Sequence, residues 1–423
     1  MSFETISVIG LGYIGLPTAA MFAAYGKNVI GVDVNQHAVD TINRGEIHIV
    51  EPDLDAIVHK AVSDGKLKAV LTPEAADAFL IAVPTPFLPT ENESDIPQPD
   101  LKYIQSAAKA IAPVLKKGDL VILESTSPVG ATEKMADWLA EYRTDLTFPK
   151  THAEESDIRI AHCPERVLPG HVVRELVEND RVIGGLTNKC SEQATKLYKT
   201  FVKGDCVVTN ARTAEMAKLT ENSCRDVQIA FANELSIICD KLDIDVWELI
   251  SLANRHPRIN ILQPGPGVGG HCIAVDPWFI VSKTPEQAIL IHTARKVNDS
   301  KPQWVVDKVK IAISDFLQGN PDKTAKEVAI ACYGLAFKPD IDDLRESPAL
   351  GISKSIAEFH KGQIYAVEPN INESNTLLDT LNLVGLSTAL NNADIHVLLV
   401  DHQEFKEVAI ESKFIIDTKG IWS

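Results

Sequence analysis

The sequence predicts an α/β protein with two doubly wound parallel sheets, joined by a long central helix and a helical middle domain. Short apolar segments alternate with helical patterns over residues 1–208, and the same alternation returns over residues 315–423. Residues 209–314 between them are dominated by helical spacing. Alternating strands and helices of this kind form parallel sheets with helices on both faces. We therefore expect a Rossmann-like first domain, a helical middle domain and a Rossmann-like last domain with these boundaries.

Composition narrows the class of protein. The chain has 423 residues, of which 45% are apolar and 23% charged, and its formal net charge of −17 argues against nucleic acid or an anionic membrane as a partner. Its seven cysteines are scattered without a C-x-x-C pair, which suits a reducing cytosol and predicts neither disulfides nor a metal site. No apolar run is long enough to span a membrane, and the first residues lack a signal-peptide pattern. We expect a cytoplasmic globular protein.

The first element is a glycine turn between a strand and a helix. Residues 5–9 form an apolar strand pattern, residues 16–25 a helical pattern, and residues 29–32 a second strand that ends at Asp33. A G-x-G-x-x-G turn in this context binds a dinucleotide, whereas a lone one is often a plain turn. Asp33 is expected to accept hydrogen bonds from the ribose and to repel a 2′-phosphate, which favours NAD over NADP. The turn residues expected to contact NAD are Gly10, Gly12, Tyr13, Ile14 and Gly15.

Two further strands of this domain end in small polar residues. The strand pattern at residues 79–83 leads to Thr85, and the pattern at residues 120–123 leads to Thr126. Ligands bind at the carboxyl ends of parallel strands, so both threonines are candidate cofactor contacts. The alternative is that both only cap helices.

The middle domain opens with a long helix that carries a polar stripe. Lys218, Asn222 and Arg225 are spaced by four and three residues, so they share one face of the helix predicted from Thr213 onward. Such a face is either a solvent-exposed stripe or a set of donors that point at an oxyanion. A long helix between two domains is also suited to pack against its twin, which predicts a homodimer.

A glycine-dense loop over residues 264–272 ends at Cys272, and Asp276 follows four residues later. Glycines at this density cost conformational entropy, so the loop needs a reason to keep them, and a thiol at its end is open to close approach by a substrate. Most lone cysteines are small buried hydrophobes. The loop favours the other role, a thiol that does covalent chemistry.

The last domain repeats the plan of the first in a worn form. Residues 328–334 align with residues 6–12, and only the middle glycine of the turn remains, as Gly334. The mononucleotide part of a substrate therefore suits this domain better than a full dinucleotide. An insertion after the turn places Lys338 and Arg345 near the edge where phosphates are expected, although two solvated surface cations are the alternative.

Six segments together resemble the nucleotide-diphosphate-sugar 6-dehydrogenases, the UDP-glucose/GDP-mannose dehydrogenase family, along essentially the whole chain. One segment alone has little specificity, but all six in this order are highly specific. The resemblance implies an enzyme that oxidises a primary alcohol twice, to a carboxylate, with two NAD. The segments are the turn at 10–15, Glu124-Ser125-Thr126, Cys163-Pro164-Glu165-Arg166, Glu215 to Asn222, Gly267 to Asp276, and Phe337 to Ala349.

Within the family, residues 163–170 and 254–258 are most similar to the branch that oxidises UDP-N-acetyl-D-mannosamine. The arginine at position 166 suits an acetamido carbonyl, where the UDP-glucose branch usually has a phenylalanine-like residue. UDP-glucose and UDP-N-acetylglucosamine remain alternative substrates, because the catalytic residues are shared. A catalytically dead nucleotide-binding scaffold is the alternative of another class, but none of the catalytic positions is missing. The branch implies bacterial surface polysaccharide synthesis, such as that of enterobacterial common antigen.

The resemblance also implies the roles of the catalytic residues. Lys218, directly or through water, takes the proton of the C6 hydroxyl while hydride passes to NAD. The Cys272 thiolate attacks the aldehyde, and Lys218 with Asn222 stabilises the resulting oxyanion. A second hydride transfer gives a thioester. The water that hydrolyses the thioester is expected beside Asp276, Glu165 and Thr126.

Contacts to the UDP-sugar are implied mainly along the middle and last domains. The diphosphate and uridine are expected against the last domain, held by Lys338 and the loop at 258–269, with Arg345 on the cofactor side. In relatives an arginine near position 258 comes from the other subunit, which implies that the site needs a dimer. The implied UDP-sugar contacts are Arg166, Val167, Lys218, Asn222, Arg225, His256, Arg258, Gly269, Phe337, Lys338 and Lys419.

Overall fold

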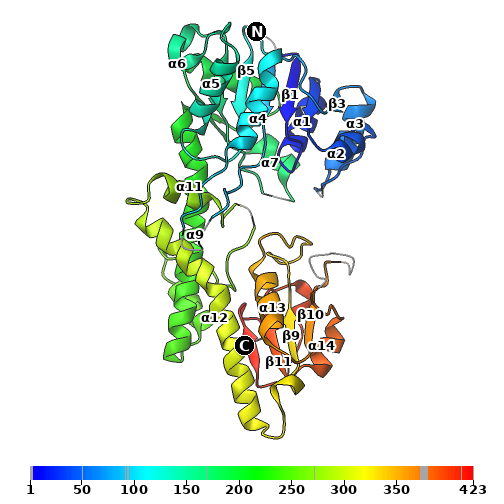
Figure 1. The fold of residues 1–423 in the computed structure, drawn as a ribbon, viewed down its shortest axis with the longest axis vertical. Helices are drawn as coiled ribbons and strands as arrows, with labels where there is room; N and C mark the ends of the chain where they lie inside the picture. The colour runs from blue at the N-terminus through cyan, green and yellow to red at the C-terminus, as the bar shows by residue number, and fades with distance from the viewer. Residues whose placement is uncertain are drawn as a thin grey trace. The chain divides into compact units, whose positions relative to one another are not determined.

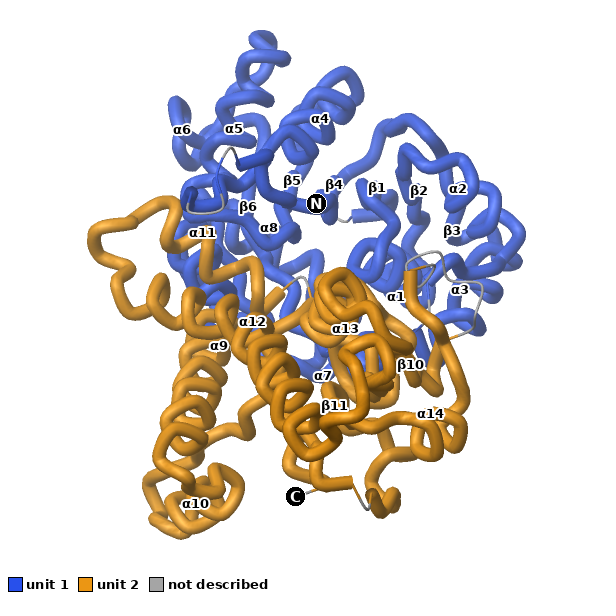
Figure 2. The backbone as a smooth tube through the Cα atoms, turned by 60° about the horizontal axis from the view of Figure 1, so that its bottom comes forward, with its two compact units in different colours: residues 1–221 blue, residues 222–423 orange. Residues whose placement is uncertain are grey.

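The computed structural model describes residues 3–49, 51–90, 92, 95–168, 170–270, 272–371, 380–410 and 412–422. The chain forms two compact units, Met1–Glu221 and Asn222–Ser423, which Figure 2 draws in different colours. The boundary falls inside the long helix α9 (Ala211–Leu242), which begins in the first unit and continues in the second. The domain boundaries expected at 208/209 and 314/315 remain predictions.

A twisted eight-stranded sheet forms the centre of the first unit (Figure 1), in the order β3-β2-β1-β4-β5-β6-β7-β8. Neighbouring strands run parallel except β6 and β7, which pair antiparallel. The strands are β1 Thr5–Ile9, β2 Asn28–Val32, β3 Leu67–Val70, β4 Ala78–Ile81, β5 Leu120–Leu123, β6 Arg159–His162, β7 Arg181–Gly185 and β8 Cys206–Asn210. The helices before α9 are α1 Gly15–Ala24, α2 Gln36–Asn43, α3 Leu54–Ser63, α4 Lys102–Ile111, α5 Ala131–Tyr142, α6 Pro149–His152, α7 Val172–Glu178 and α8 Asn188–Tyr198, with short 3₁₀ helices at Ala112–Val114 and Ala153–Glu155.

Alternation of apolar side chains explains why helices cover both faces of this sheet. Successive residues of a strand point to opposite faces, so Leu120 and Ile122 of β5 join one core while Val121 and Leu123 join the other. Helices α1, α3, α7 and α8 close the first core, and α4 and α5 close the second. The sheet is therefore doubly wound, as the sequence predicts.

The second unit combines long helices with a smaller sheet. After α9 come α10 Val246–Ala253, α11 Asp276–Lys283 and α12 Ile289–Gly319. The four-stranded sheet has the order β10-β9-β11-β12 and its strands are all parallel. Helices α12 and α13 cover one face and α14 lies on the other. The remaining elements are β9 Ile330–Tyr333, α13 Pro348–Phe359, β10 Ile364–Val367, α14 Leu386–Asn392, β11 Ile395–Leu398 and β12 Ile415–Asp417, with 3₁₀ helices at Ala325–Glu327 and Gln403–Phe405.

The predicted fold class is confirmed in both units. The expected strands at residues 5–9 and 120–123 match β1 and β5 residue for residue, and the central helix runs a few residues further at each end than expected. The worn copy shows the same strand–turn–helix plan as the first domain, in β9 to α13. Within the described part of the chain, no helix has both the length and the apolar character needed to cross a membrane.

Candidate active site

The glycine turn between β1 and α1 has the geometry that a dinucleotide site needs. Gly10 has a φ of 91°, and its backbone N–H donates to the Val32 carbonyl oxygen at 2.8 Å. A Cβ on Gly10 would lie 2.5 Å from the Ala82 carbonyl oxygen, and one on Gly15 would collide with the carbonyl of Gly10. A Cβ on Gly12 would meet nothing within 4 Å. Two glycines are thus required by the turn itself, while Gly12 leaves open space beside the helix N-terminus.

Asp33 closes the same turn from the end of β2. Its Oδ2 accepts a hydrogen bond from the Leu11 backbone N–H at 2.8 Å, and its Oδ1 accepts one from the Asn35 N–H at 2.9 Å. Tyr13 is 39% exposed and Ile14 half-buried at the start of α1, whose N-terminus no described side chain caps. The open turn, the oriented carboxylate and the helix N-terminus fit a dinucleotide pyrophosphate with its ribose.

Polar side chains gather beyond the edge of the sheet where the neighbouring strands β4 and β5 end. The Ser125 Oγ accepts from the Val83 N–H at 2.9 Å and donates to the Ile81 carbonyl oxygen at 3.2 Å, so it joins the two strand-end loops. The Thr85 hydroxyl oxygen is buried without a hydrogen-bond partner among the described residues, and Thr126 is half-buried. Neither threonine occupies the N-cap position of α4 or α5, so the alternative role as helix caps is wrong.

Glu215 fastens the start of α9 to the loop that carries Thr126. Its carboxylate is fully buried and accepts from the Gly130 N–H at 2.6 Å, the Thr132 N–H at 2.8 Å and the Thr132 hydroxyl at 2.7 Å. Burial raises the pKa of Glu215, and these three hydrogen bonds oppose the rise. Glu215 therefore caps α5 from another element, a role that the motif alone did not reveal.

Glu165 and Arg166 follow β6 and bind different partners. Glu165 is 7% exposed, and its Oε2 accepts from the Arg181 Nη2 at 2.7 Å while its Oε1 accepts from the Arg166 backbone N–H at 2.7 Å. The Arg166 side chain forms an ion pair with Glu221 of α9, with 2.5 Å between Nη2 and Oε1. Val167 packs against the core of the first unit. Arg166 thus reaches the helix that bears the polar stripe.

Behind Glu165 lies a buried carboxyl group that sequence reasoning missed. Glu124 Oε1 accepts from the Tyr198 hydroxyl at 2.5 Å and lies 3.7 Å from Arg181 Nη1. Burial raises the pKa of Glu124 to about 7, although the charge of Arg181 works against the rise. The partners stand far away in the sequence, so local patterns give no signal for this cluster.

The polar stripe of α9 continues across the boundary between the units. Lys218 is half-buried, Asn222 is half-buried one turn further, and Arg225 is exposed. The Asn222 Nδ2 donates to the Asp276 Oδ2 at 2.5 Å. Two residues expected in catalysis, separated by 54 positions, are therefore in direct contact.

Cys272 stands immediately before helix α11. Its carbonyl oxygen accepts from the Val275 N–H at 3.1 Å and the Asp276 N–H at 2.9 Å, which places it in the turn that starts the helix. Asp276 is buried as the first residue of α11, whereas Cys272 is exposed. All seven cysteines lie in the described part of the chain, and none forms a disulfide. The thiol is thus accessible next to a buried carboxylate.

The glycines before Cys272 pack against the segment that follows β9. Gly267 has a φ of 149°, and a Cβ there would lie 2.9 Å from the Pro348 Cβ. A Cβ on Gly269 would lie 2.8 Å from the Phe337 Cβ, and Gly270, at a φ of 76°, lies under the Phe337 ring. Close packing in the second unit is therefore one reason for the glycine density, in addition to the expected approach of a substrate.

The worn turn of the second unit uses its carboxylate internally. Glu368 Oε2 accepts from the Leu335 N–H at 2.7 Å and the Ala336 N–H at 3.0 Å, in the position that Asp33 holds in the first unit. His402 is fully buried, and its Nδ1 accepts from the Asp340 N–H at 2.9 Å. Its Nε2 therefore carries the proton and donates to Glu368 at 3.0 Å. The Glu368 carboxylate is therefore engaged within the protein and is not available to accept hydrogen bonds from a ribose.

The cations expected around the substrate differ in their surroundings. Lys338 is exposed. Arg345 forms a two-pronged ion pair with Asp343, with 2.9 Å from Nε to Oδ1 and 2.6 Å from Nη2 to Oδ2. Lys419 is half-buried and lies 3.0 Å from Asp401. The structure thus supplies partners for two of the three predicted cations.

His256 and Arg258 lie in an exposed loop after α10. The Asn254 side chain joins the two ends of this loop. It donates to the Ile261 carbonyl oxygen at 2.9 Å and accepts from the Ile261 N–H at 2.7 Å. Among the residues that the structure describes, no group of three or more His, Cys, Asp or Glu side chains is arranged to hold a metal ion.

The expected site residues divide between the two units. The first unit brings together the dinucleotide turn and the strand-end threonines. The second brings together Asn222 with Asp276, and Gly269 with Phe337. The first unit holds Gly10, Gly12, Tyr13, Ile14, Gly15, Asp33, Thr85, Thr126, Glu165, Arg166, Val167 and Lys218; the second holds Asn222, Arg225, His256, Arg258, Gly269, Cys272, Asp276, Phe337, Lys338, Arg345 and Lys419.

A doubly wound sheet with this glycine turn and carboxylate is typical of a dinucleotide-dependent oxidoreductase. Three family models match the chain: the NAD binding domain of the UDP-glucose/GDP-mannose dehydrogenase family at residues 4–202, its central domain at 212–300 and its UDP binding domain at 331–423. The chain belongs to the UDP-glucose/GDP-mannose dehydrogenase family, and its cofactor is NAD.

Similar proteins span the whole chain. A UDP-N-acetyl-D-mannosamine dehydrogenase from Yersinia pestis is 67% identical over 100% of both chains, and one from Escherichia coli K12 is 64% identical over 100% of both. An NDP-N-acetyl-D-galactosaminuronic acid dehydrogenase from Ralstonia nicotianae is 63% identical over 100% of this chain and 97% of its own. The solved structure of a UDP-D-ManNAc dehydrogenase from Pyrococcus horikoshii is similar with a TM-score of 0.86 at 39% identity, covering 99% of this chain and 96% of its own.

Proposed function

We propose that this protein oxidises the C6 hydroxyl of UDP-N-acetyl-D-mannosamine to a carboxylate, in two steps, with two NAD per sugar. The observation that carries the proposal is the identity of 64–67% with UDP-N-acetyl-D-mannosamine dehydrogenases over the full length of both chains. The direct contact of Asn222 with Asp276, beside the exposed Cys272, supports the chemistry. A role in surface polysaccharide synthesis is part of the proposal, in keeping with the enterobacterial sources of the similar proteins. A cytoplasmic location is proposed with it.

The dinucleotide turn is proposed to hold the cofactor. Gly12 leaves room for the pyrophosphate at the N-terminus of α1, and Asp33 is oriented to accept from the ribose hydroxyls. The buried hydroxyl of Thr85 and the half-buried Thr126 lie at the sheet edge where such a ligand ends. When bound, NAD supplies the hydride acceptor for both oxidation steps.

Three residues are proposed to carry the first oxidation and the capture of its product. Lys218, directly or through a water, removes the proton from the C6 hydroxyl. The Cys272 thiolate then adds to the aldehyde carbon, so that the half-oxidised sugar stays bound as a thiohemiacetal. Lys218 and the amide of Asn222 stabilise the oxyanion that forms in this addition.

Hydrolysis of the thioester completes the proposed reaction. After the second oxidation, water attacks the thioester carbon and the Cys272 thiol leaves. Asp276 is proposed to orient this water, since Asn222 fixes its carboxylate by the hydrogen bond of 2.5 Å. Glu165 and Thr126 are proposed to assist, and the ion pair with Arg181 fixes the Glu165 carboxylate.

The substrate contacts follow the placement of cations and small residues. Phe337, Lys338 and Lys419, in the domain that matches the UDP binding model, are proposed to hold the UDP portion together with the loop near Gly269. Arg345 is proposed to lie on the cofactor side. The sugar and its acetamido group are assigned to Arg166, Val167, Lys218, Asn222, Arg225, His256 and Arg258.

A homodimer is part of the proposal. Large apolar side chains of α9, α10 and the following loop remain exposed, including Phe231 at 51%, Leu242 at 61% and Leu252 at 60%. Exposed apolar side chains that gather on neighbouring elements are typical of protein–protein interfaces. A second copy of the chain is the proposed partner, because a long helix with an exposed apolar flank is suited to pack against its twin.

An N-acetylgalactosamine-type substrate is the second candidate. The relative from Ralstonia, named for an N-acetyl-D-galactosaminuronic acid, is almost as similar as the mannosamine enzymes, at 63% identity over the full chain. Both candidates carry an acetamido group, which suits Arg166. UDP-glucose is the less favoured alternative, because the solved structure of a UDP-glucose dehydrogenase shares only 25% sequence identity with this chain.

A panel of UDP-sugars tests the proposal. NADH formation is followed with UDP-N-acetyl-D-mannosamine, UDP-N-acetylgalactosamine, UDP-N-acetylglucosamine and UDP-glucose, each at limiting concentration. The expected result is the highest kcat/KM for the mannosamine sugar and two NADH per sugar consumed. A plateau at one NADH per sugar contradicts the double oxidation, and a preference for another sugar contradicts the substrate assignment.

A further inference from the structure

A buried polar chain joins the two longest helices of the second unit. Asp226 of α9 forms an ion pair with Arg295 of α12, with 2.5 Å between Oδ1 and Nη1. The Asn298 Nδ2 donates to the Asp226 Oδ1 at 2.8 Å, and the Asn233 Nδ2 donates to the Asn298 Oδ1 at 2.9 Å. All four side chains are buried. Polar groups at this depth fix each other's orientation, because each would be costly to leave unpaired.

Asn233 extends this chain into the loop that carries Cys272. Its Oδ1 accepts a hydrogen bond from the Gly265 backbone N–H at 2.9 Å. Asn233 is fully buried and Gly265 is buried as well. Both the donor and the acceptor of the Asn233 amide are therefore engaged, one with helix α12 and one with the root of the loop, so its side chain has one orientation.

The far part of the same loop is held differently. A Cβ on Gly267 would lie 3.2 Å from the Pro302 Cγ of α12 and 2.9 Å from the Pro348 Cβ, so this glycine is packed and has no side chain of its own to anchor it. The hydrogen bond at Gly265 is thus a polar anchor of the loop root in the described structure, seven residues before the thiol. We propose that Asn233 is a positioning residue, which holds this root so that the Cys272 thiol meets the substrate carbon. The inference rests on the proposed function of Cys272 as the nucleophile.

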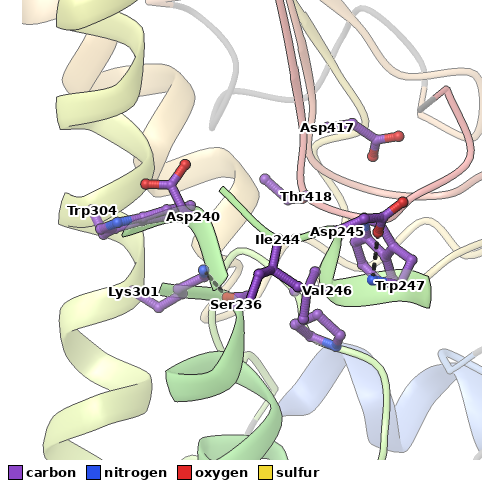
Figure 3. Close-up of a pocket in the computed structure, with 12 residues that line it drawn as sticks. Ser236, Asp240, Ile244, Asp245, Val246, Trp247, Lys301, Trp304, Asp417 and Thr418 are labelled. Carbon is purple, nitrogen blue, oxygen red and sulfur yellow. Dashed lines mark hydrogen bonds between the residues drawn. The ribbon is translucent and has the colours of Figure 1, made fainter. Parts of the chain in front are cut away.

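One turn further along α9 lies a matched polar group that does not bond to the loop. The Lys301 Nζ donates to the Ser236 Oγ at 2.5 Å, and the Ser236 Oγ donates to the Asn233 carbonyl oxygen at 2.6 Å. Figure 3 shows this pair at the wall of a cavity of about 260 Å³, which Pro264 and Gly265 also line. Ser236 is a buried neighbour of Asn233 on the same helix and is also hydrogen-bonded, so a Ser236→Ala variant controls for a general loss of stability.

The test compares Asn233→Ala and the better-filling Asn233→Leu with Ser236→Ala in the full-length protein. Hydrogen exchange by mass spectrometry reads the amide protection of residues 263–270, and steady-state kinetics reads kcat and KM for the UDP-sugar. Because the Gly265 N–H loses its buried acceptor, exchange of the loop is expected to rise by about tenfold or more in the Asn233 variants. We expect kcat to fall by about tenfold in the Asn233 variants, with NAD affinity unchanged. In Ser236→Ala, we expect both the loop exchange and kcat to stay near their native values.

Two outcomes overturn the inference. If loop exchange in both Asn233 variants matches Ser236→Ala, Asn233 does not hold the loop. If exchange rises but kcat stays native, the tether exists without positioning the thiol. Failure of the proposed function is a separate result, because the native protein would then form no NADH from any UDP-sugar while the exchange comparison still gives its answer.

Discussion

At the scale of single residues, the proposed nucleophile of the second unit and the residue proposed to orient water differ in their exposure to solvent. Cys272 is exposed at the start of α11, whereas Asp276 is buried and held by the Asn222 amide. A nucleophile needs access to its substrate, while a group that orients water needs a fixed direction. The same short segment meets both needs, because Cys272 lies exposed in the turn before α11 and Asp276 is buried as the first residue of the helix.

Replacement of the thiol tests the nucleophile. Cys272→Ala is expected to reduce overall formation of acid by at least about a thousandfold, because no covalent adduct can form, while NAD binding stays native. NADH formation and a binding titration with NAD check the two parts. Cys224→Ala is the matched control, since Cys224 is also exposed but belongs to α9 and not to the loop. Near-native turnover of Cys272→Ala would disprove the covalent route.

Lys301 gives the protein a pH dependence of stability. Burial lowers the pKa of this side chain to about 7, with Lys308 adding to the shift and Asp240 opposing it; Ser236 and the Trp304 ring also face the amine. The folded state therefore holds fewer protons than the unfolded state between about pH 7 and pH 10, where an ordinary lysine is still charged.

Stability from this group is thus expected to rise with pH across that window. Urea denaturation of the native protein and of Lys301→Met is measured at pH 7 and at pH 9.5. The free energy of unfolding of the native protein, relative to that of the variant, should rise by on the order of 2 kcal/mol between the two pH values. A difference between the two proteins that does not change with pH would show that Lys301 is charged in the folded state throughout.

At the scale of elements, helix α9 carries residues with three different roles. Glu215 near its start caps α5, Lys218, Asn222 and Arg225 form the polar stripe further along, and Asn233 holds the cysteine loop. Within each unit, the backbone hydrogen bonds of the helix fix the spacing of the side chains that it carries. Substitutions at its buried contacts are therefore expected to cost more than substitutions at its surface.

Two glutamates that link α5 to α9 allow a direct comparison. Glu215→Ala leaves the buried N–H groups of Gly130 and Thr132 without an acceptor, so we expect a loss of about 2–4 kcal/mol in the free energy of unfolding. Glu133→Ala breaks an exposed ion pair with Arg212, and its expected cost is much smaller because solvent screens such a pair. Equal costs in urea denaturation would show that Glu215 is not a structural cap.

Sequence patterns predict the elements well because their signals are local. The glycine turn, the strand that ends at Asp33 and the spacing of Lys218 and Asn222 all depend on residues within one or two elements. The contacts that orient the site depend on partners far away in the chain, such as Glu215 with Thr132 and Asn233 with Gly265. No periodicity encodes these pairs, so only the folded structure reveals them.

At the scale of the whole molecule, the proposed dimer follows from apolar surface on α9 and α10. Leu242 and Leu252 are 61% and 60% exposed, and Phe231, Ile238 and Ile244 in the same part of the chain are exposed as well. A charge placed there would have to be buried in the interface, at a cost of several kcal/mol. The double variant Leu242→Glu, Leu252→Glu is therefore expected to be monomeric.

Sedimentation of this double variant measures the assembly. Its mass should fall to about that of one chain, 46.2 kDa, while Tyr142→Glu, which changes an exposed aromatic residue of α5, should keep the native mass. Activity should fall together with the mass, since a neighbouring subunit is proposed to complete the site. An unchanged mass in the double variant would assign this surface to another purpose.

The hydrogen bonds that already engage the Glu368 carboxylate have a consequence for the number of NAD molecules that one chain binds. The chain contains two copies of one nucleotide-binding plan, but His402 and two backbone amides already satisfy the second carboxylate. A calorimetric titration is therefore expected to saturate at one NAD per chain, and adenosine-based inhibitors should compete at that one place only. The His402 imidazole is the difference between the two turns, because Asp33 also accepts hydrogen bonds from two backbone amides and is still expected to bind a ribose.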